Sequence, residues 1–316
     1  MERAAVQAIV VTRYGGPDVL ELAETPAPQP RAGQVRIAVR AAGTNPVDAG
    51  NRADASWSGL VLPWIPGYEV SGVVDQLGDG VTELSLGDRV MAMTRFRRQT
   101  GGYAEHVVVE ADAVAKLADA TSFVAAAATP IAGGTASDVL DRLNLAGGDR
   151  LLVLGASGGV GSYLLQLASL SGVEVCALGR AEHHDRMRAL GASNAVDYRL
   201  PGAVQQLDGQ RVDAVADLVG GEAITAWLPA LRPGGQIAAI ATPELDLDPL
   251  LDDNITFHGV LIRNDGDRTR RLARLLGDGT IVAHVSHTFR LDEAEHAHRI
   301  LESGHSGGKV VLVVGP

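Results

Sequence analysis

Apolar and polar positions alternate in two different ways along the chain, and the change falls near residue 122. Before it, short runs with a two-residue period, such as 34–40 and 72–77, are separated by Gly, Pro and Asp, which predicts strands joined by turns. From Phe123 onward, short apolar runs alternate with helical patterns, which predicts a parallel, doubly wound sheet with right-handed crossovers. The expected strands are 151–154, 173–178, 195–197, 214–219 and 236–240, and the expected helices are 125–143 with a break at Pro130, 162–171, 182–190 and 222–231.

The end of the chain differs from this α/β middle part. After Arg263 we expect a helix rich in Arg and Leu, a strand near 284–289, a helix over 292–301 and a strand in the apolar run 309–314. A chain of 316 residues is long enough for two domains, each with its own core. The expected division is a β-rich domain over 1–122, an α/β domain over 123–262 and a return segment over 263–316 that completes the first domain.

A glycine-rich turn follows the expected strand 151–154. It reads Gly155-Ala156-Ser157-Gly158-Gly159-Val160-Gly161-Ser162 and leads into a helix. Gly158 lets the backbone pass close to a pyrophosphate, Gly161 lets the helix pack on the strand, and the helix N-terminus offers free N–H groups to an anion. Ala156 stands where the G-x-G-x-x-G pattern has its first glycine, so a tight turn without a ligand is the alternative. The flanking strand and helix favour a dinucleotide site over residues 156–161.

The end of the next strand bears on which dinucleotide is bound. An NAD site expects a carboxylate about 20 residues after the turn, but the strand 173–178 ends in Gly179-Arg180, with His183 and His184 shortly after. A guanidinium suits a 2′-phosphate through charge-assisted hydrogen bonds. We therefore expect NADPH rather than NADH, the alternative being that Arg180 is a solvated loop charge.

Composition excludes several other classes of protein. With 27 Lys and Arg against 38 Asp and Glu, and Arg95-Phe96-Arg97-Arg98 as the main basic run, nucleic acid is not an expected partner. No apolar stretch reaches the length of about 18 residues that a membrane helix needs, and the N-terminus shows no signal-peptide pattern. We expect a cytoplasmic protein without a membrane partner. The single cysteine, Cys176, can build neither an internal disulfide nor a Cys₄ zinc site.

Several ordered motifs carry a resemblance to one enzyme family. They are Tyr14-Gly15-Gly16-Pro17-Asp18-Val19-Leu20, Asn45-Pro46-Val47-Asp48, residues 66–74, Gly87-Asp88-Arg89-Val90, Gly101-Gly102-Tyr103-Ala104-Glu105, residues 156–161, Asp197-Tyr198-Arg199 and Gly308-Lys309-Val310-Val311. In these the chain resembles the zinc-free, zeta-crystallin-like quinone oxidoreductases of the medium-chain dehydrogenase/reductases. The resemblance implies a GroES-like β-rich catalytic domain, a Rossmann NADPH-binding domain and an active-site cleft between them.

The same comparison separates the chain from zinc-dependent alcohol dehydrogenases. Where those enzymes have a cysteine and the histidine of a Gly-His-Glu motif, this chain has Thr44-Asn45 and Tyr68. A catalytic zinc would lack its ligands, so we expect no metal and a hydride acceptor that is already activated, a quinone or an α,β-unsaturated carbonyl. The resemblance implies that Asn45 donates to the acceptor oxygen as charge develops there, a turn residue being the alternative. Tyr68 is expected to be either a weak acid or a wall of the cleft.

Other positions depart from the family pattern on the acceptor side. Two tyrosines common in the family are replaced here by Gly50 and Ser56, and Trp57 and Trp64 can supply an aromatic wall instead or pack within their own domain. Two alternatives to the quinone or enone oxidoreductase therefore stay open. One is an enoyl-thioester or enone reductase that uses Tyr68 or Tyr14 as a proton donor, and the other is a non-catalytic NADPH-binding protein of sensor or crystallin type.

The remaining expectations concern one ion pair and, as the resemblance implies, the assembly of subunits and the cofactor residues. Glu69 is expected to pair with an arginine, Arg52 or Arg89. Residues 254–262 form a β-prone segment at the end of the sheet series, through which two subunits are expected to join as a homodimer. The cofactor residues implied are Thr129, Pro130 and Thr135 under the nicotinamide and pyrophosphate, Tyr198 beside the 2′-phosphate, Ala241 and Thr242 at the nicotinamide edge, and Lys309 near the phosphates, a surface lysine being the alternative.

Overall fold

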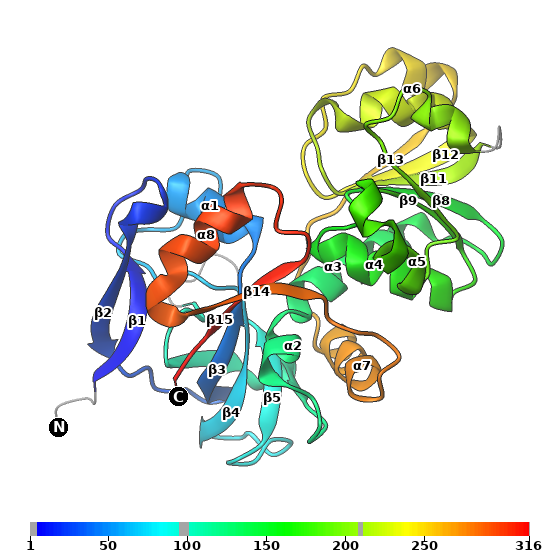
Figure 1. The fold of residues 1–316 in the computed structure, drawn as a ribbon. Coiled ribbons are helices and arrows are strands. Elements are labelled where there is room, and N and C mark those ends of the chain that lie inside the picture. Colours follow the sequence, from blue (N-terminus) through cyan, green and yellow to red (C-terminus); the bar gives the residue numbers. More distant parts are fainter. Residues whose placement is uncertain (1–4, 95–100, 208–210, 316) are drawn as a thin grey trace. The chain divides into compact units, whose positions relative to one another are not determined.

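The chain divides into two compact units, each with its own sheet and core. In the computed structural model, the first unit consists of Met1–Ile131 with Arg263–Pro316, and the second unit is Ala132–Ile262 (Figure 1). The structure describes residues 5–94, 101–207 and 211–315. The basic run Arg95-Phe96-Arg97-Arg98 lies outside the described residues.

The first unit is built on a mostly antiparallel sheet in which neighbouring strands come from both ends of the chain. Its strands lie in the order β14-β15-β3-β4-β5-β7, and β6 pairs with β3. The C-terminal strand β15 pairs antiparallel with β3, so that Val311 lies opposite Gly43. These strands are β3 (Gln34–Gly43), β4 (Glu69–Leu77), β5 (Arg89–Met93), β6 (His106–Glu110), β7 (Val114–Lys116), β14 (Val285–Arg290) and β15 (Lys309–Val313).

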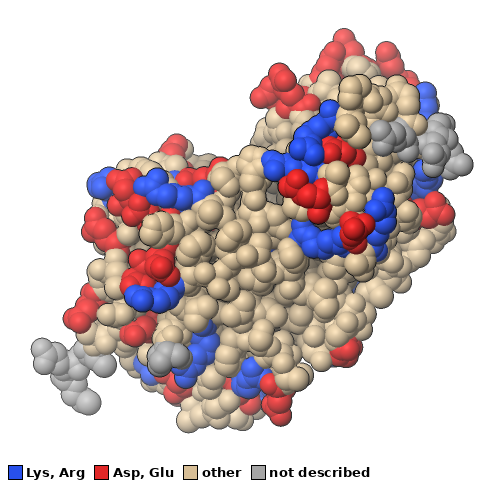
Figure 2. Space-filling model, in the orientation of Figure 1, with Lys and Arg blue, Asp and Glu red and all other residues tan. Residues whose placement is uncertain are grey.

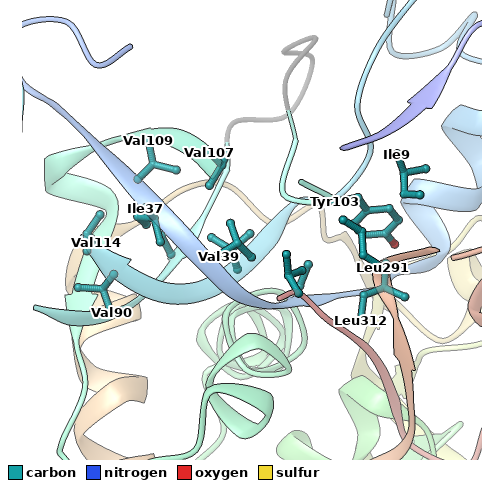
Figure 3. Close-up of a cluster of buried hydrophobic side chains, with 14 of the residues drawn as sticks. Ile9, Ile37, Val39, Val90, Tyr103, Val107, Val109, Val114, Leu291 and Leu312 are labelled. Atoms are coloured by element: carbon teal, nitrogen blue, oxygen red, sulfur yellow. The ribbon is translucent and has the colours of Figure 1, made fainter. Parts of the chain in front are cut away.

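Alternating apolar residues of these strands form the core of the first unit. Figure 3 shows Ile37 and Val39 of β3 among Val90, Val107 and Val109, all of them buried. Strands β1 (Ala5–Val11) and β2 (Leu20–Pro26) pair antiparallel beside this core. The α-helices of this part of the chain are α1 (Pro46–Ala53), α2 (Phe123–Ala127), α7 (Gly266–Gly277) and α8 (Ala294–Glu302), and the 3₁₀ turns are η1 (Pro17–Val19), η2 (Ala111–Ala113) and η6 (Leu291–Glu293).

The second unit contains a parallel sheet of six strands in the order β10-β9-β8-β11-β12-β13. Counted from the first strand of the unit, this is the order 3-2-1-4-5-6 of a dinucleotide-binding fold, which places a ligand crevice beyond the carboxyl ends of β8 and β11. The strands are β8 (Arg150–Leu154), β9 (Glu174–Leu178), β10 (Asn194–Val196), β11 (Val212–Asp217), β12 (Leu231–Ala239) and β13 (Thr256–Gly259). The helices are α3 (Pro130–Leu143), which begins at the junction of the units, α4 (Gly159–Leu170), α5 (His184–Ala189), α6 (Asp248–Asp252) and the 3₁₀ segments η3 (Ala181–His183), η4 (Ala203–Leu207) and η5 (Glu222–Ala230).

Two expected elements of the second unit differ in the structure. The segment expected as an α-helix over 222–231 is the 3₁₀ segment η5, which contains Pro229; proline lacks the N–H that an α-helix needs. The strand expected to run to 219 ends at Asp217, whose carboxylate accepts hydrogen bonds from the backbone N–H groups of Val219 and Gly220. That local hydrogen bonding turns the chain out of the sheet.

The outer surface is mixed in charge. On the face drawn in Figure 2, basic and acidic side chains are interspersed in small groups. Within the described ranges, the helices are all too short or too polar to cross a membrane. At one edge of the parallel sheet, β13 exposes Phe257, and Leu261 lies exposed just beyond it.

Candidate active site

The glycine-rich turn of the second unit has the geometry of an anion-binding helix terminus. Strand β8 ends at Leu154, and α4 begins after its N-cap residue, Gly158. A Cβ atom at Gly161 would lie 2.5 Å from the carbonyl oxygens of Ala156 and Gly155, so only glycine fits there. Among the described side chains none caps α4 at Gly158, which leaves the first N–H groups of the helix for a ligand.

A group of cationic side chains lies beside this turn, at the end of β9. Arg180 Nη1 is 3.6 Å from Glu182 Oε1, and Arg186 Nη2 donates to the backbone oxygen of Ser157, in the turn itself, at 3.2 Å. Burial, followed by the charge of Arg186, lowers the pKa of His183. Sequence analysis did not include Arg186 among the cofactor residues. Its position in the first turn of α5, shortly after β9, was the signal that could have indicated it.

A buried carboxylate near this group, Asp197, is engaged by another arginine. Asp197, just after β10, accepts hydrogen bonds from Arg199 at 2.6 and 3.0 Å and from the backbone N–H of Ala181. The Arg199 guanidinium holds the pKa of Asp197 well below its usual range. Tyr198, between these two residues, is half-exposed. The ends of β9 and β10 thus carry several cationic side chains, and the buried carboxylate of Asp197 is already paired with Arg199.

The other predicted cofactor residues lie in both units. Thr129, in the first unit, is buried and donates its hydroxyl to the backbone oxygen of Ala125 at 2.8 Å. Thr135 is buried on α3, in the second unit. Thr242 follows β12, and its backbone oxygen accepts from the N–H of Gly221 at 3.0 Å, which holds residues 241–242 next to the end of β11.

In the first unit, Asn45, Glu69 and Lys309 form a buried polar cluster. The Asn45 Nδ2 group donates to Glu69 Oε1 at 2.9 Å. The Lys309 ammonium donates to Asn45 Oδ1 at 2.6 Å, to Glu69 Oε1 at 2.7 Å and to the backbone oxygen of Thr44 at 2.8 Å. The second carboxylate oxygen of Glu69 accepts from the backbone N–H of Ile131 at 2.7 Å. Every donor of the ammonium thus has a protein acceptor.

Local structure positions two members of this cluster, Asn45 and Glu69. Asn45 is the N-cap of α1, and its backbone N–H donates to Asp48 Oδ2 at 2.9 Å in a capping box. Glu69 is the first residue of β4 and lies opposite Gly43 of β3. A Cβ atom at Gly43 would lie 2.3 Å from Glu69 Oε1 and 2.4 Å from the oxygen of Ala127, so glycine is needed to admit the carboxylate.

The prediction that Glu69 pairs with Arg52 or Arg89 is wrong. Its cationic partner is Lys309. Arg52 is buried beside Glu302 and His298, and Arg89 donates to backbone oxygens and lies over the ring of Phe123. The partner of Glu69 is 240 residues away in sequence, so local pattern gave no signal for it.

Tyr68 lies next to the cluster and is oriented by Asn51. Asn51 Nδ2 donates to the Tyr68 hydroxyl oxygen at 2.7 Å. Burial, followed by the negative charge of Asp48, raises the pKa of Tyr68. Trp64 is 1% exposed within a core cluster of its own unit, whereas Trp57 is 49% exposed. Trp64 therefore packs as a core residue.

Comparison with known proteins identifies the family. Residues 31–119 match the family described as the alcohol dehydrogenase GroES-like domain, and residues 190–312 match the family described as zinc-binding dehydrogenase. The chain is 31% identical to a chloroplastic NADPH-dependent alkenal/one oxidoreductase of Arabidopsis thaliana, over 97% of this chain and 79% of that protein. It belongs to the medium-chain dehydrogenase/reductases, in their quinone oxidoreductase branch.

Two solved structures have the same fold throughout. The quinone oxidoreductase of Coxiella burnetii is 31% identical, covers 99% of this chain and all of its own, and has a TM-score of 0.90. A mycobacterial protein solved in complex with NADPH is 31% identical, covers 98% of this chain and 99% of its own, and has a TM-score of 0.87. The expected GroES-like and Rossmann architecture is confirmed.

The residues of this chain do not fit the zinc that one family description implies. Asn45 and Tyr68 offer a neutral amide and a phenol of raised pKa, both poor ligands for zinc. Glu69 is already paired with the Lys309 ammonium, whose charge repels a divalent cation. Within the described ranges, no group of three or more His, Cys, Asp and Glu side chains is placed to hold a metal ion.

The carboxyl group of Asp48 gives the stability of the protein a testable pH dependence. Burial raises its pKa to about 7, from 3.8 for an ordinary aspartate, although the N–H groups of Gly67 and Asn45 act in the opposite direction. Between these two values the unfolded chain loses the proton and the folded chain keeps it, so stability due to Asp48 is lost as pH rises. The free energy of unfolding of the wild type, relative to that of Asp48→Asn, is expected to fall by up to about 4 kcal/mol across this window.

Denaturant titrations at several pH values measure this difference. His298→Gln is the control, because burial lowers the pKa of His298 to about 3. Stability due to His298 is therefore lost as pH falls, which gives the opposite slope. A difference between wild type and Asp48→Asn that stays constant from acid to neutral pH would contradict the assignment.

Proposed function

We propose that this protein is an NADPH-dependent oxidoreductase that reduces a quinone or an α,β-unsaturated carbonyl without a metal. The observation that carries the proposal is the Asn45 carboxamide, whose oxygen is held by Lys309 and whose nitrogen is held by Glu69. A bound NADPH would supply the hydride. The names of the relatives, one an alkenal/one oxidoreductase and another a quinone oxidoreductase, support this class of acceptor.

On the acceptor side, the chain supplies hydrogen-bond donors. When a hydride adds to an enone or quinone, negative charge develops on the acceptor oxygen, and a fixed donor there lowers the barrier. Asn45 Nδ2 carries two hydrogens, of which one is used by Glu69. We assign the second to the acceptor oxygen and the Tyr68 hydroxyl to a second contact or to protonation of the product.

On the cofactor side, most of the residues that would hold NADPH come from the second unit, and Thr129 comes from the first. The turn 156–161 and the N-terminus of α4 fit the pyrophosphate, and Arg180, Arg186 and Tyr198 suit the 2′-phosphate. Thr129, Thr135 and residues 241–242 are assigned to the nicotinamide. The expected contact of Lys309 with the phosphates and the expected cytoplasmic location stay predictions.

Cofactor preference follows from the end of β9. We expect NADPH to bind more tightly than NADH. Arg180→Ala is expected to reduce the difference in binding free energy between the two nucleotides by about 1–3 kcal/mol, the contribution of a charge-assisted hydrogen bond. Nucleotide fluorescence gives both dissociation constants. Arg188→Ala is the matched control, because Arg188 is an exposed arginine close by on α5 that pairs with Asp185. Equal affinities of the wild type for the two nucleotides would refute the assignment.

If Asn45 donates to the acceptor oxygen, removal of its carboxamide should slow the reaction. Asn45→Ala is expected to lower kcat/KM by about 10²–10³, the cost of removing one donor to a developing oxyanion, with the NADPH dissociation constant unchanged. Asn264→Ala serves as the control, because it removes one hydrogen bond to the backbone oxygen of Met93 in the same unit. If every accepted quinone and enone keeps its turnover in Asn45→Ala, Asn45 is a turn residue only.

Tyr68 separates the two enzymatic alternatives. An enone or enoyl-thioester reductase that takes its proton from this hydroxyl is expected to lose rate by a factor of about 10²–10⁴ in Tyr68→Phe. A quinone reductase is expected to lose little, since solvent can protonate a hydroquinone. Steady-state rates with a quinone, an enone and an acyl-thioester decide between them, and a protein that turns over none of the three is a non-catalytic NADPH binder.

We also propose that two subunits associate through β13, the exposed edge of the parallel sheet. Phe257 and Leu261 are 43% and 65% exposed there, and an apolar edge of this kind is covered in stable proteins. Light scattering is expected to give twice the chain mass of 32.9 kDa. In Phe257→Lys the measured mass is expected to fall toward that of one chain. A wild-type monomer at micromolar concentration would exclude the dimer.

A further inference from the structure

Lys309 is buried in the first unit, with 4% of its surface exposed, and it is bound to the residue that the proposed function assigns to the acceptor. An ammonium has three N–H donors. Those of Lys309 go to the backbone oxygen of Thr44, to Asn45 Oδ1 and to Glu69 Oε1. The lysine therefore has no donor left for a further ligand.

The two charges select one orientation of the Asn45 carboxamide. A carboxamide has an oxygen that only accepts and a nitrogen that only donates, although the two groups have nearly the same size. Here the oxygen faces the ammonium of Lys309 and the nitrogen faces the carboxylate of Glu69. A carboxamide turned by 180° would place its nitrogen against the cation and its oxygen against the anion. Both contacts would then be repulsive, so the pair excludes that orientation.

The charge on Lys309 also affects the donor strength of the amide. A cation 2.6 Å from Oδ1 withdraws electron density from the carboxamide, which makes its N–H groups better donors in a site of low dielectric. The Glu69 carboxylate is itself fixed at its other oxygen by the backbone N–H of Ile131, in the first turn of α3. Asn45 is thus held by a cation and by an anion that cannot swing away.

We propose that Lys309 is a positioning residue for the acceptor: together with Glu69 it fixes the Asn45 carboxamide so that an N–H group faces the acceptor oxygen. The inference rests on the proposed function, because it requires that Asn45 contacts the acceptor. It assigns Lys309 to the acceptor side of the reaction in place of the cofactor phosphates.

The test removes both charges together. A single Lys309→Met would leave Glu69 as an unpaired buried charge and can prevent folding. The variant to measure is therefore Lys309→Met with Glu69→Gln, whose folding is checked by its thermal unfolding temperature. Lys116→Met is the control, because Lys116 is an exposed lysine paired with Asp88 on the same sheet. Each change is made both in the wild type and in the Asn45→Ala background.

We expect the paired variant to lower kcat by about 10-fold or more with a quinone or an enone, since a misplaced contact group costs this much or more. The NADPH dissociation constant is expected to stay unchanged, and the control is expected to behave as the wild type. In the Asn45→Ala background the paired variant is expected to cause no further loss, because its effect passes through Asn45.

Three results would overturn the inference and leave the proposed function standing. One is a folded paired variant with unchanged kcat while Asn45→Ala is impaired. Another is an equal loss in both backgrounds, which would show that Lys309 acts without Asn45. The third is weaker NADPH binding with unchanged kcat, which would place Lys309 at the cofactor. If Asn45→Ala alone has no effect, the acceptor role of Asn45 in the proposed function fails, and the inference fails with it.

Discussion

The carboxylate of Glu69 is the constraint on which the acceptor side of this structure depends. It has no solvent exposure, and a charge in such a place is tolerated only when it is paired and hydrogen-bonded. Its three donors come from the start of α1, the start of α3 and the C-terminal strand β15. The first unit therefore has to assemble from both ends of the chain before this charge is satisfied, and the arrangement of Asn45 follows from it.

The same cluster explains how a fold shared with zinc enzymes can work with other residues. A zinc ion polarises a substrate oxygen as a Lewis acid. In the arrangement we propose for this chain, the Lys309 ammonium polarises the Asn45 carboxamide, which then offers an N–H to the acceptor. A hydrogen-bond donor stabilises charge less than a metal does, which suits acceptors that are already activated, such as quinones and enones. This is the physical basis of the metal-free proposal.

Local features of the site could be predicted from the sequence, and long-range ones could not. The turn at 155–162 is set by residues close in sequence, so pattern and spacing were enough to predict it. The short helix α1, with Asn45 as its N-cap, was not predicted. The pairing of Glu69 with Lys309 depends on the antiparallel pairing of β15 with β3, which brings together residues 240 positions apart. For that reason the sequence analysis predicted an arginine as the partner of Glu69, and the partner is Lys309. Arg186 was missed because its relation to the turn depends on how α5 packs beside Ser157.

We propose that the chain's own residues, without a metal, make the acceptor ready for a hydride. The most direct measurement combines elemental analysis of the purified protein with its rate of NADPH oxidation by a quinone and by an enone, before and after treatment with a chelator. We expect turnover by protein that contains far less than one metal ion per chain, with a rate that the chelator leaves unchanged. Activity that follows one bound zinc per chain, and is lost on its removal and restored by its return, would contradict the account.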